Sequence, residues 1–467
     1  MTQQLVENRS LVERAAAFWA AADFADMPSD GVHAAKRHLL DTLAAAIAGA
    51  RSAAVDSVLR AFHHGMPAGG GAGILWGRDE CVAPTVAALV NGTAAHALEL
   101  DDFGGCGHSG AAVIPAVLAA AALRPAPGRD LLLAIIAGYD IASRTLEAAG
   151  GYAAHNQRGW HSTATCGTFG AAAGAAVALR LDETQFADAL GVGGTFVGGV
   201  WAFLADGALT KRIHGGKAAE SGLAAALMAR EGLTGPHHIF EAPWGGFLDC
   251  YARETRCEAA FQEGLGEEFH ILRSGLKPYP CCRGIHSVLD GLTDIMSSDH
   301  LSAEDIEGFI VHGDAHTIRQ LGKADVATLF EAQFSIPYCL AVTAVDGALT
   351  LPALEAVRVS EPKVRRLIAA TQIKPDRDLG RNGHPDLTVI LRNGAELSRA
   401  TPFPKGDPRN PLSDGELLAK AQGLIGPVLG TDHAGRLIDT IMSLDTLPDC
   451  TRLFDLLQAG PASANRI

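Results

Sequence analysis

Three carboxylates, a thiol and two histidines are gathered in residues 96–110, a segment whose side chains can hold or move a proton. They are, in order, His96, Glu99, Asp101, Asp102, Cys106 and His108. Three carboxylates at the end of an apolar helix cost folding free energy unless they are paired or solvated. The glycines around Cys106 let backbone approach a ligand closely, and a helix expected from residue 110 offers free N–H groups to an anion. The alternative is an ordinary helix end, a flexible loop and a capping serine.

A second and a third cluster add an acid–base group and positive charge. His161 stands at the start of a buried helix, and an imidazole with a pKa near 6.5 suits proton transfer at neutral pH. Taken alone, that pattern is more typical of a helix N-cap by Ser162 or Thr163 with a bystander histidine. The third cluster places four basic or titratable side chains within seven residues: Lys211, Arg212, His214 and Lys217. Between apolar helices of an acidic protein, this favours an anion-binding loop over a solvated basic turn.

The fourth cluster, residues 277–286, lies at an expected domain junction and holds Lys277, Arg283 and His286. Cations at a domain boundary are suited to grip carboxylates across a cleft. The two adjacent cysteines between them point in different directions, which makes them poor joint metal ligands. Tyr338 stands at the start of another helix and indicates little by itself. The chain has no GxxxxGK[ST], GxSxG or HExxH, and its GVGGTFVGG follows no strand, so we expect neither a metal nor another cofactor.

Composition indicates a globular, cytoplasmic protein. Of the 467 residues, 48% are hydrophobic and 19% charged, which is enough apolar material for two cores. The net charge of −14 and the lack of a basic stripe argue against a nucleic-acid partner. The nine cysteines are odd in number and form no CxxC, which favours a reducing compartment. No signal-peptide pattern opens the sequence, and the longest weakly charged stretch, 103–123, is too short in apolar residues to span a membrane.

The order of hydrophobic patterns predicts a mainly α fold, with a large helical domain and a smaller α+β lid domain. Ala- and Leu-rich segments predict buried helices at 31–50, 82–99, 110–124, 129–147, 164–180, 183–202 and 216–231. Alternating segments predict strands of an antiparallel sheet at 306–312, 355–359 and 386–392, between helices at 284–297, 335–346 and 361–371. A Pro-rich connector at 401–412 precedes a return to helix. We therefore expect a helical domain of residues 1–268 and 402–467, interrupted by a lid of residues 269–401.

Five motifs, in order and over nearly the whole chain, resemble the 2-methylcitrate dehydratase (MmgE/PrpD) family. They are HALELDD with His108 downstream, GWHSTATCGTFGAAA, FLADGALTKRIHGGKAAESG, KPYPCCRGIH and AQFSIPY. The resemblance implies a homodimer whose sites lie in clefts between a helical domain and an α+β lid. Activities of the family are dehydration of methylcitrate, decarboxylation of cis-aconitate and epimerisation of iminodisuccinate. The resemblance implies that these need no metal, and that a proton moves at, or a carbanion forms beside, a carboxylate of a small polycarboxylate.

The resemblance also assigns roles to residues that fall on the family's motifs. It places the following at the active site: Glu99, Asp101, His108, His161, Lys211, Lys277, His286 and Tyr338. His108 and His161 are expected to be the acid–base pair, and Tyr338 to donate or relay a proton. Lys211 and Lys277 are expected to hold substrate carboxylates and offset the charge of an enolate-like transition state. Arg283, beside them, is expected to clamp a further carboxylate.

Two departures from the family pattern bear on the substrate. Glu99 stands where dehydratases and decarboxylases commonly have Asp, and Phe103 stands where they have Thr. Their His-Pro-Ser-Gly is shortened here to His108-Ser-Gly, with Cys106 close by. A phenyl ring in place of a hydroxyl should shrink or depolarise the pocket. A thiol near the site would suit a two-base epimerisation, unless Cys106 simply packs.

The first hypothesis is therefore a 2-methylcitrate dehydratase-like lyase that removes water or another group β to a carboxylate. The close alternatives are an epimerase or racemase of an amino- or imino-dicarboxylate, resembling iminodisuccinate epimerase, and an activity like that of cis-aconitate decarboxylase. A catalytically inactive binding or scaffold protein is an alternative of a different class.

Overall fold

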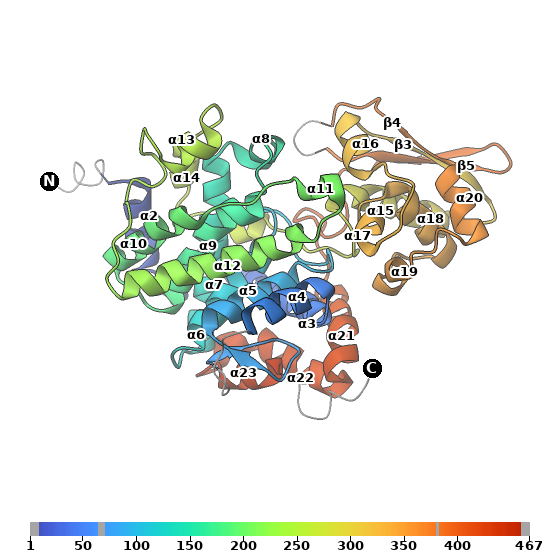
Figure 1. Ribbon diagram of the computed structural model, residues 1–467. Coiled ribbons are helices and arrows are strands. Elements are labelled where there is room, and N and C mark those ends of the chain that lie inside the picture. The colour runs from blue at the N-terminus through green and yellow to red at the C-terminus, as the bar shows by residue number, and fades with distance from the viewer. Residues whose placement is uncertain (1–8, 64–70, 380–382, 459–467) are drawn as a thin grey trace.

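Helices make up most of the protein, in a large helical body from which a smaller lid extends (Figure 1). The computed structural model describes residues 9–63, 71–379 and 383–458. The helices of the body are α2 (Leu11–Trp19), α3 (Ser29–Gly49), α4 (Ala53–His63), α5 (Pro84–Ala95), α6 (Ser109–Ala121), α7 (Gly128–Ala148), α8 (Gly151–Gln157), α9 (Ser162–Ala178), α10 (Glu183–Gly193), α11 (Phe203–Asp206), α12 (Thr210–Arg230), α13 (Phe247–Ala252), α14 (Glu258–Gln262), α21 (Asp414–Leu429), α22 (Thr431–Met442) and α23 (Thr451–Leu457). A two-stranded hairpin, β1 (Gly73–Ile74) with β2 (Cys81–Val82), lies beside α5. The predicted mainly α fold is confirmed.

Small residues allow the central helices of the body to approach closely. Helices α6 and α9 are buried on nearly every face, as their uniformly apolar sequences predict. A Cβ on Gly170 of α9 would lie 2.5 Å from the Cβ of Ala142 in α7, and one on Gly216 of α12 would lie 2.1 Å from the carbonyl oxygen of Leu89 in α5. Glycine is therefore required at both crossings, which bring α9 close to α7 and α12 close to α5.

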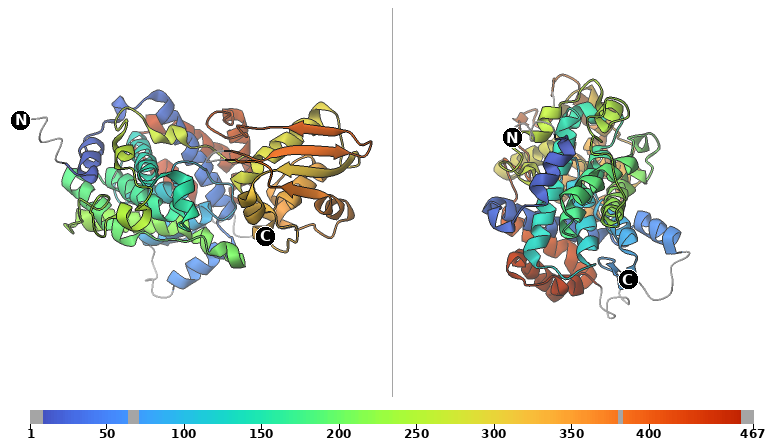
Figure 2. Two further views of the ribbon diagram at one scale, coloured as in Figure 1. Left: turned by 90° about the horizontal axis from the view of Figure 1, so that it is seen from above. Right: turned by 90° about the vertical axis from the view of Figure 1, so that its left-hand side faces the viewer.

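The lid consists of a four-stranded sheet covered by helices. Its elements are α15 (His286–Ser298), β3 (Ile306–His312), α16 (Ala315–Leu321), α17 (Leu329–Gln333), α18 (Ile336–Asp346), α19 (Leu351–Glu355), α20 (Pro362–Ala369), β4 (Thr371–Lys374), β5 (Asp386–Leu391) and β6 (Glu396–Arg399). The strand order is β4-β3-β5-β6. Helix α15 packs on β5 and β6 and α20 packs on β3, and the lid projects from one end of the body (Figure 2).

Several predicted elements differ from the structure for local reasons. The predicted strand at 355–359 is wrong, because α19 ends at Glu355 and Val357 has a positive φ of 41°, which breaks an extended run. The prediction of a wholly antiparallel sheet is also wrong: β4 pairs parallel with β3, and the helices between these strands make the crossover. The predicted helix 183–202 ends at Gly193, where the glycine-rich segment begins.

The hydrophobic residues form two main buried clusters. The first joins side chains from the N-terminal half, from the segment around Leu276, and from the C-terminal helices α21–α23. The second is formed by residues of the lid together with Phe203 of α11. Helix α21 returns from the lid to pack against α3, so distant parts of the chain lie side by side in the body (Figure 1). We propose that these clusters correspond to the two predicted domains, with the first boundary between Leu276 and Cys281 rather than at 269.

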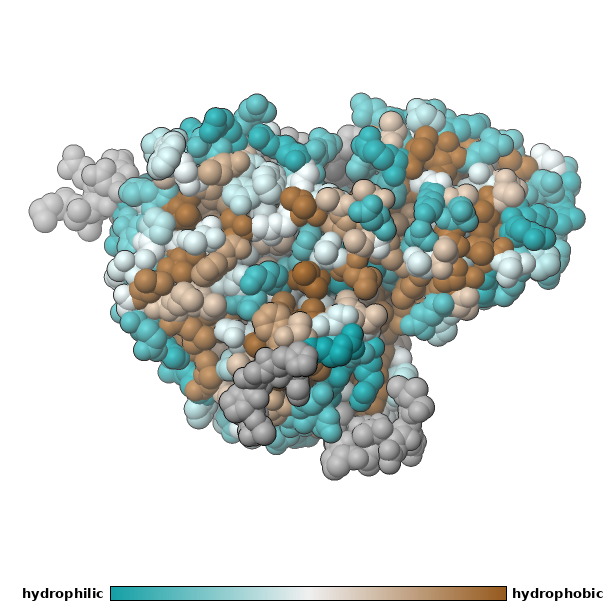
Figure 3. Space-filling model, viewed as in Figure 1, coloured by the Kyte–Doolittle hydropathy of each residue, from teal (hydrophilic) through white to brown (hydrophobic). Residues whose placement is uncertain are grey.

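Apolar side chains on the surface form small patches among hydrophilic residues on the face drawn in Figure 3. No single helix in the described part of the chain is long and apolar enough to cross a membrane. Among the helices of the described residues, α3 and α4 taken together have the length and apolar composition of a span, but they are bent by 82°.

Candidate active site

One carboxylate, that of Asp101, lies between two imidazoles just after α5. The Oδ2 atom of Asp101 is 2.7 Å from Nδ1 of His96 and 3.1 Å from Nδ1 of His108. Nδ1 of His108 is also 2.7 Å from the backbone carbonyl oxygen of Asp102. Since both neighbours of this nitrogen are acceptors, the His108 proton is on Nδ1 and its Nε2 is a bare acceptor. Burial raises the pKa of Asp101, but the two imidazoles outweigh it and hold this pKa well below the usual value.

The carboxylate of Glu99 is held by three cations in the interior. Oε1 of Glu99 contacts the ammonium group of Lys211 and lies 2.7 Å from Nη1 of Arg212. Lys277 places its ammonium group 3.1 Å from Oε2 and 3.2 Å from the backbone carbonyl oxygen of the same residue. All four side chains are almost fully buried. We call this group, Glu99 with Lys211, Arg212 and Lys277, the cation cluster.

Burial and charge act differently on the members of the cation cluster. Burial raises the pKa of Glu99, but the three cations outweigh it and hold that pKa well below its usual value. Burial lowers the pKa of Lys211, and Arg212 and Lys277 act in the same direction against the opposing effect of Glu99. Burial also acts to lower the pKa of Lys277, but Glu99 and Asp101 reverse the direction and raise it. Lys211 is therefore the more acidic of the two ammonium groups.

The second acid–base candidate, His161, forms a pair with a histidine of α12. Nδ1 of His161 lies 2.9 Å from Nδ1 of His214. The ring centroids of His108 and His161 are 6.5 Å apart, and His96 forms a triangle with them, 4.6 Å from His108 and 6.0 Å from His161. Trp201 packs its ring edge-on against His161, with centroids 5.0 Å apart. The two acid–base candidates, His108 and His161, therefore lie close together beside Lys211 of the cation cluster.

Three helix starts position these side chains. His108 and His161 are the N-cap residues of α6 and α9, and Lys211 lies in the first turn of α12. Peptide dipoles make each helix start partly positive, and with the cations they favour an anionic ligand. The N–H of Gly110, in the first turn of α6, already donates to Asp102, whose two carboxylate oxygens each lie 3.1 Å away. The predicted anion at that helix start is thus a residue of the chain itself.

The loop between Phe103 and His108 brings the body against the segment that leads into the lid. Phe103 and Gly275 exchange two backbone hydrogen bonds, of 2.9 and 2.8 Å. Gly107 has a φ of 117°, and a Cβ there would lie 2.8 Å from Oγ1 of Thr163, so the loop requires glycine at this position. Cys106 is fully buried, with its thiol 3.4 Å from Oγ of Ser109, and burial raises the pKa of this thiol to about 12.

Arg283 lies beside Phe103 of this loop, and His286 follows it as the first residue of α15. The guanidinium carbon of Arg283 is 4.2 Å from the centre of the Phe103 ring, and its Nη2 is 3.4 Å from Oδ2 of Asp407. Nε and Nη1 of Arg283 and Nδ1 of His286 are buried and have no hydrogen-bond partner in the described part of the chain. Burial lowers the pKa of Arg283 to about 10, against the effect of Asp407. Two guanidinium donors and an imidazole nitrogen are therefore available to a ligand that reaches them.

Tyr338 lies in the core of the lid, away from the other residues predicted for the active site. Its hydroxyl donates to the carbonyl oxygen of Ala353 at 3.1 Å and accepts the backbone N–H of Arg358 at 2.9 Å. The side chain is fully buried in the hydrophobic cluster of the lid. Both hydrogen-bonding functions of the phenol are thus occupied by lid backbone, and Tyr338 positions the turn after α19.

The structure therefore gathers most of the predicted residues and adds others. Glu99, Asp101, His108, His161, Lys211 and Lys277 form one connected group. Phe103, Arg283 and His286 lie where the body meets the segment leading into the lid, whereas Cys106 packs in the core of the body. The additions are His96, Arg212, His214 and Gln333. Gln333 at the end of α17 accepts from Arg212 at 2.7 Å and donates to the carbonyl oxygen of Leu98 at 2.7 Å, which ties the lid to the cation cluster.

One group of side chains in the described residues has the spacing of metal ligands: His96, Asp101 and His108, with ligand atoms within 4.8 Å of one another. These atoms already form hydrogen bonds to each other, so a metal ion would have to displace the shared protons. Lys277 also lies 4.0 Å from Oδ1 of Asp101, and a second positive charge there would be repelled. The group fits a hydrogen-bonded acid–base unit better than a metal site.

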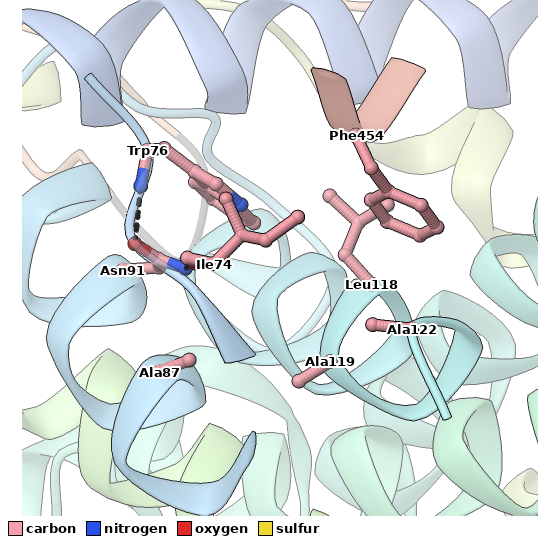
Figure 4. A pocket seen from close by; sticks show the side chains of 8 residues that line it. All are labelled: Ile74, Trp76, Ala87, Asn91, Leu118, Ala119, Ala122 and Phe454. Atoms are coloured by element: carbon pink, nitrogen blue, oxygen red, sulfur yellow. Dashed lines mark hydrogen bonds between the residues drawn. The ribbon is translucent and has the colours of Figure 1, made fainter. Parts of the chain in front are cut away.

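Two cavities lie away from the histidines. The smaller, of about 10 Å³, is a packing gap between the β1 hairpin and α6 that is too small for a metabolite. Figure 4 shows its lining residues: Ile74, Trp76, Ala87, Asn91, Leu118, Ala119, Ala122 and Phe454. The larger, of about 130 Å³, lies between residues 271–276 and the connector 406–412, beside His38.

Comparison with known proteins identifies the family. Models of the MmgE/PrpD N-terminal domain and the MmgE/PrpD C-terminal domain match residues 13–260 and 279–446. The chain belongs to the MmgE/PrpD family. The C-terminal model includes α21 and α22, which pack on the helical body rather than on the lid.

Several relatives are similar over almost their whole length. The cis-aconitate decarboxylase of Homo sapiens is 28% identical over 92% of this chain and 91% of its own. The cis-aconitate decarboxylase of Aspergillus terreus is 27% identical over 92% of each chain. The cis-aconitate decarboxylase-like protein oryM of Aspergillus oryzae is 26% identical over 92% of this chain and 94% of its own. The protein is thus an enzyme of the MmgE/PrpD family related to lyases.

Proposed function

We propose that this member of the MmgE/PrpD family is a lyase of a small tricarboxylic acid that works by moving a proton at a carbon next to a carboxylate. The observation that carries the proposal is the pair His108 and His161, 6.5 Å apart between ring centroids, beside the cation cluster. Histidine is the usual proton carrier near neutral pH. A site with two imidazoles and three cations is suited to an anionic substrate that must lose or gain one proton.

His108 is the proposed general base. Its Nδ1 proton is directed at the carboxylate of Asp101 and the carbonyl oxygen of Asp102, so its Nε2 is free to accept a proton. Asp101 also stabilises the imidazolium that forms when this happens, as a buried carboxylate next to a histidine does. His161 is the proposed acid on the other side of the reacting carbon.

The cation cluster is the proposed carboxylate-binding part of the site. Glu99 already neutralises one of its three charges, and Asp101 lies near Lys277, so a substrate carboxylate would share the remaining positive charge. Stabilising an enolate-like charge with preorganised cations lowers the barrier to proton abstraction. Arg283 has two unused guanidinium donors and is the proposed partner of a further carboxylate.

Two reactions of this class remain in competition. In dehydration, His108 takes the proton from carbon, the C–H electrons form the double bond, and hydroxide leaves as water with the proton of His161. In decarboxylation, the C–C bond breaks, carbon dioxide leaves, and the electrons left on carbon take up a proton. The facing base and acid favour dehydration, as expected from the sequence, whereas the decarboxylase names of the relatives favour decarboxylation.

One experiment separates these reactions from the alternatives. The purified protein is incubated in D2O with 2-methylcitrate, cis-aconitate or an amino-dicarboxylate such as aspartate, and is followed by NMR and by carbon dioxide release. A new alkene without carbon dioxide supports a dehydratase, and carbon dioxide release supports a decarboxylase. Deuterium uptake with scrambled stereochemistry and no new alkene would overturn the lyase proposal in favour of an epimerase. Tight anion binding without turnover or exchange would indicate a binding protein.

An epimerisation that uses Cys106 as its second base has little physical support. A thiol with a pKa raised to about 12, and with no exposed surface, is a poor base at neutral pH. An epimerase would instead have to use His108 and His161 as its two bases. The same D2O experiment tests that arrangement, because two bases exchange the α-hydrogen with solvent.

A further inference from the structure

We propose that His214 is a positioning residue that sets the tautomer of His161, so that His161 presents an N–H group to the substrate. This inference rests on the function proposed above, because the choice of tautomer follows from the need for an acid, but the tautomer can be measured without a substrate. His214 lies in α12, three residues after Lys211, and so projects from the same side of that helix. His161 precedes α9, and the two side chains meet where the helices begin.

The distance between the two imidazoles restricts where their protons lie. Their Nδ1 atoms are 2.9 Å apart, a hydrogen-bond distance that requires one nitrogen with a proton and one without. Burial lowers the pKa of His214 to about 4, with Lys211 acting in the same direction. Burial, His214 and Lys211 likewise hold the pKa of His161 well below its usual value. Both rings are therefore neutral at pH 7, and each carries a single proton.

The neighbouring histidines decide between the two possible arrangements. His96 and His108 both direct Nδ1 at oxygen acceptors, so both have bare Nε2 atoms. If His161 donated its Nδ1 proton to His214, then His161, like His96 and His108, would have no proton on Nε2. If His214 donates instead, His161 carries its proton on Nε2 and supplies the acid that the base His108 lacks. The second arrangement is the one that makes an acid–base pair.

The ring of His161 is also held against rotation. Its backbone N–H donates to the carbonyl oxygen of Gly199 at 3.1 Å, and Trp201 and Phe203 pack edge-on against the ring, with centroids 5.0 and 5.8 Å away. Trp201 is itself fixed by a 2.8 Å hydrogen bond from its Nε1 to Oδ1 of Asn156. Because the ring cannot readily exchange its two nitrogens, the hydrogen bond to His214 determines which one carries the proton.

Two variants of similar side-chain size test the assignment. The amide nitrogen of His214→Asn can take the place of Nδ1 as a donor, whereas His214→Leu has no donor. Long-range 1H–15N spectra at pH 7.5 report the tautomer of each histidine, and the His161 signals are assigned by their loss in His161→Gln. We expect the Nε2–H tautomer in the wild type and in His214→Asn, and a mixed or inverted tautomer in His214→Leu. An Nδ1–H tautomer in the wild type, or an unchanged one in His214→Leu, would overturn the proposal.

Kinetics supply the second readout, with the substrate that the NMR assay identifies. Since a general acid contributes about 10²–10⁴-fold, a mispositioned one should cost about 10–10²-fold in kcat with a smaller change in KM. His214→Leu should show that loss, and His214→Asn should recover most of it. The control is His155→Gln, a buried histidine that bonds Oγ1 of Thr165 at 2.8 Å and should keep its activity. Equal losses in the Asn and Leu variants would overturn the positioning role. The tautomer measurement needs no substrate, so it stays decisive if the proposed lyase function fails.

Discussion

The ammonium group of Lys277 contacts Glu99 twice. It lies 3.1 Å from the carboxylate of Glu99 and 3.2 Å from the backbone carbonyl oxygen of Glu99. The two residues are 178 positions apart, so this contact ties the segment leading into the lid to the loop after α5. Glu99 has a positive φ of 55°, a conformation that costs free energy in a residue with a side chain. Contacts with three cations compensate for that cost, and the strained residue therefore lies where the charges of the site converge.

The first prediction concerns the stability that Glu99 provides. Glu99→Gln leaves three buried cations without their shared carboxylate, and breaking a buried ion pair on one side typically costs about 3–5 kcal/mol. We expect a loss of this size in the free energy of unfolding, measured by urea denaturation at pH 7.5.

The matched control for Glu99→Gln is an exposed ion pair. Glu304→Gln in the lid removes a surface contact with Lys363, which solvent screens, and should hardly change the denaturation midpoint. Equal effects of the two substitutions would show that the cation cluster is not a source of stability.

The second prediction is that stability falls as the pH is lowered from about 7.5 to 5. Burial lowers the pKa of His96 to about 3 and those of His155 and His214 to about 4, with nearby cations acting in the same direction. The unfolded chain protonates these residues near 6.5, so it binds more protons than the folded chain throughout this range. Each such proton contributes a slope of about 1.4 kcal/mol per pH unit.

Below pH 5 the carboxylates extend the same trend. The folded-state pKa values of Glu99 and Asp101 are depressed, so the stability they contribute is present above their unfolded values and is lost as the pH falls.

His155→Gln removes one neutral histidine and should reduce the slope between pH 7 and 5 by up to about 1.4 kcal/mol per pH unit. An unchanged slope would mean that His155 is protonated in the folded state.

The motifs predicted which residues gather, but not how they pair. Lys211 and Lys277 were expected to hold substrate carboxylates, whereas the structure pairs both with Glu99, from positions 112 and 178 residues away in the chain. Such pairing depends on helix crossings that no local pattern encodes. His96 and His214 were visible in the motifs, five residues before Asp101 and three after Lys211. Lys211 and His214 share one turn of α12, and that spacing was the signal that a single-residue assignment missed.

The fold was predicted best where packing alone decides it. Uniformly apolar, small-residue segments became the buried helices α6 and α9. Prediction was poorest in the lid, where neither β4 (Thr371–Lys374) nor β6 was predicted and the helix expected at 361–371 included the first residue of β4. These strands are half exposed, so pairing with β3 and β5 rather than their own pattern determines them. Tyr338 starts a helix as expected, but tertiary contacts turn its hydroxyl into the lid.

The third prediction concerns substrate binding by Arg283. Arg283→Met keeps the bulk against Phe103 but removes two unused donors, and a hydrogen bond to a charged group contributes about 1.5–3 kcal/mol. We expect KM to rise about 10–10²-fold with a smaller change in kcat. The control is Arg409→Met, an exposed arginine that packs on Phe403 at 4.0 Å and should leave KM unchanged. If both variants behave alike, Arg283 does not bind substrate.

The last prediction separates the role of Asp101 in catalysis from its role in folding. Asp101→Asn replaces the carboxylate that accepts hydrogen bonds from His96 and His108 with an amide. The amide can also donate a hydrogen bond, and it no longer stabilises an imidazolium. We expect kcat/KM to fall by about 10²–10⁴-fold. Asp140→Asn is the matched control, since Asp140 is equally buried and pairs with Arg144 at 2.7 Å in α7. Both variants should be less stable, but activity per folded molecule, measured below the unfolding transition, should fall only in Asp101→Asn. Full activity in that variant would remove Asp101 from the mechanism and leave the carbonyl oxygen of Asp102 as the group that orients His108.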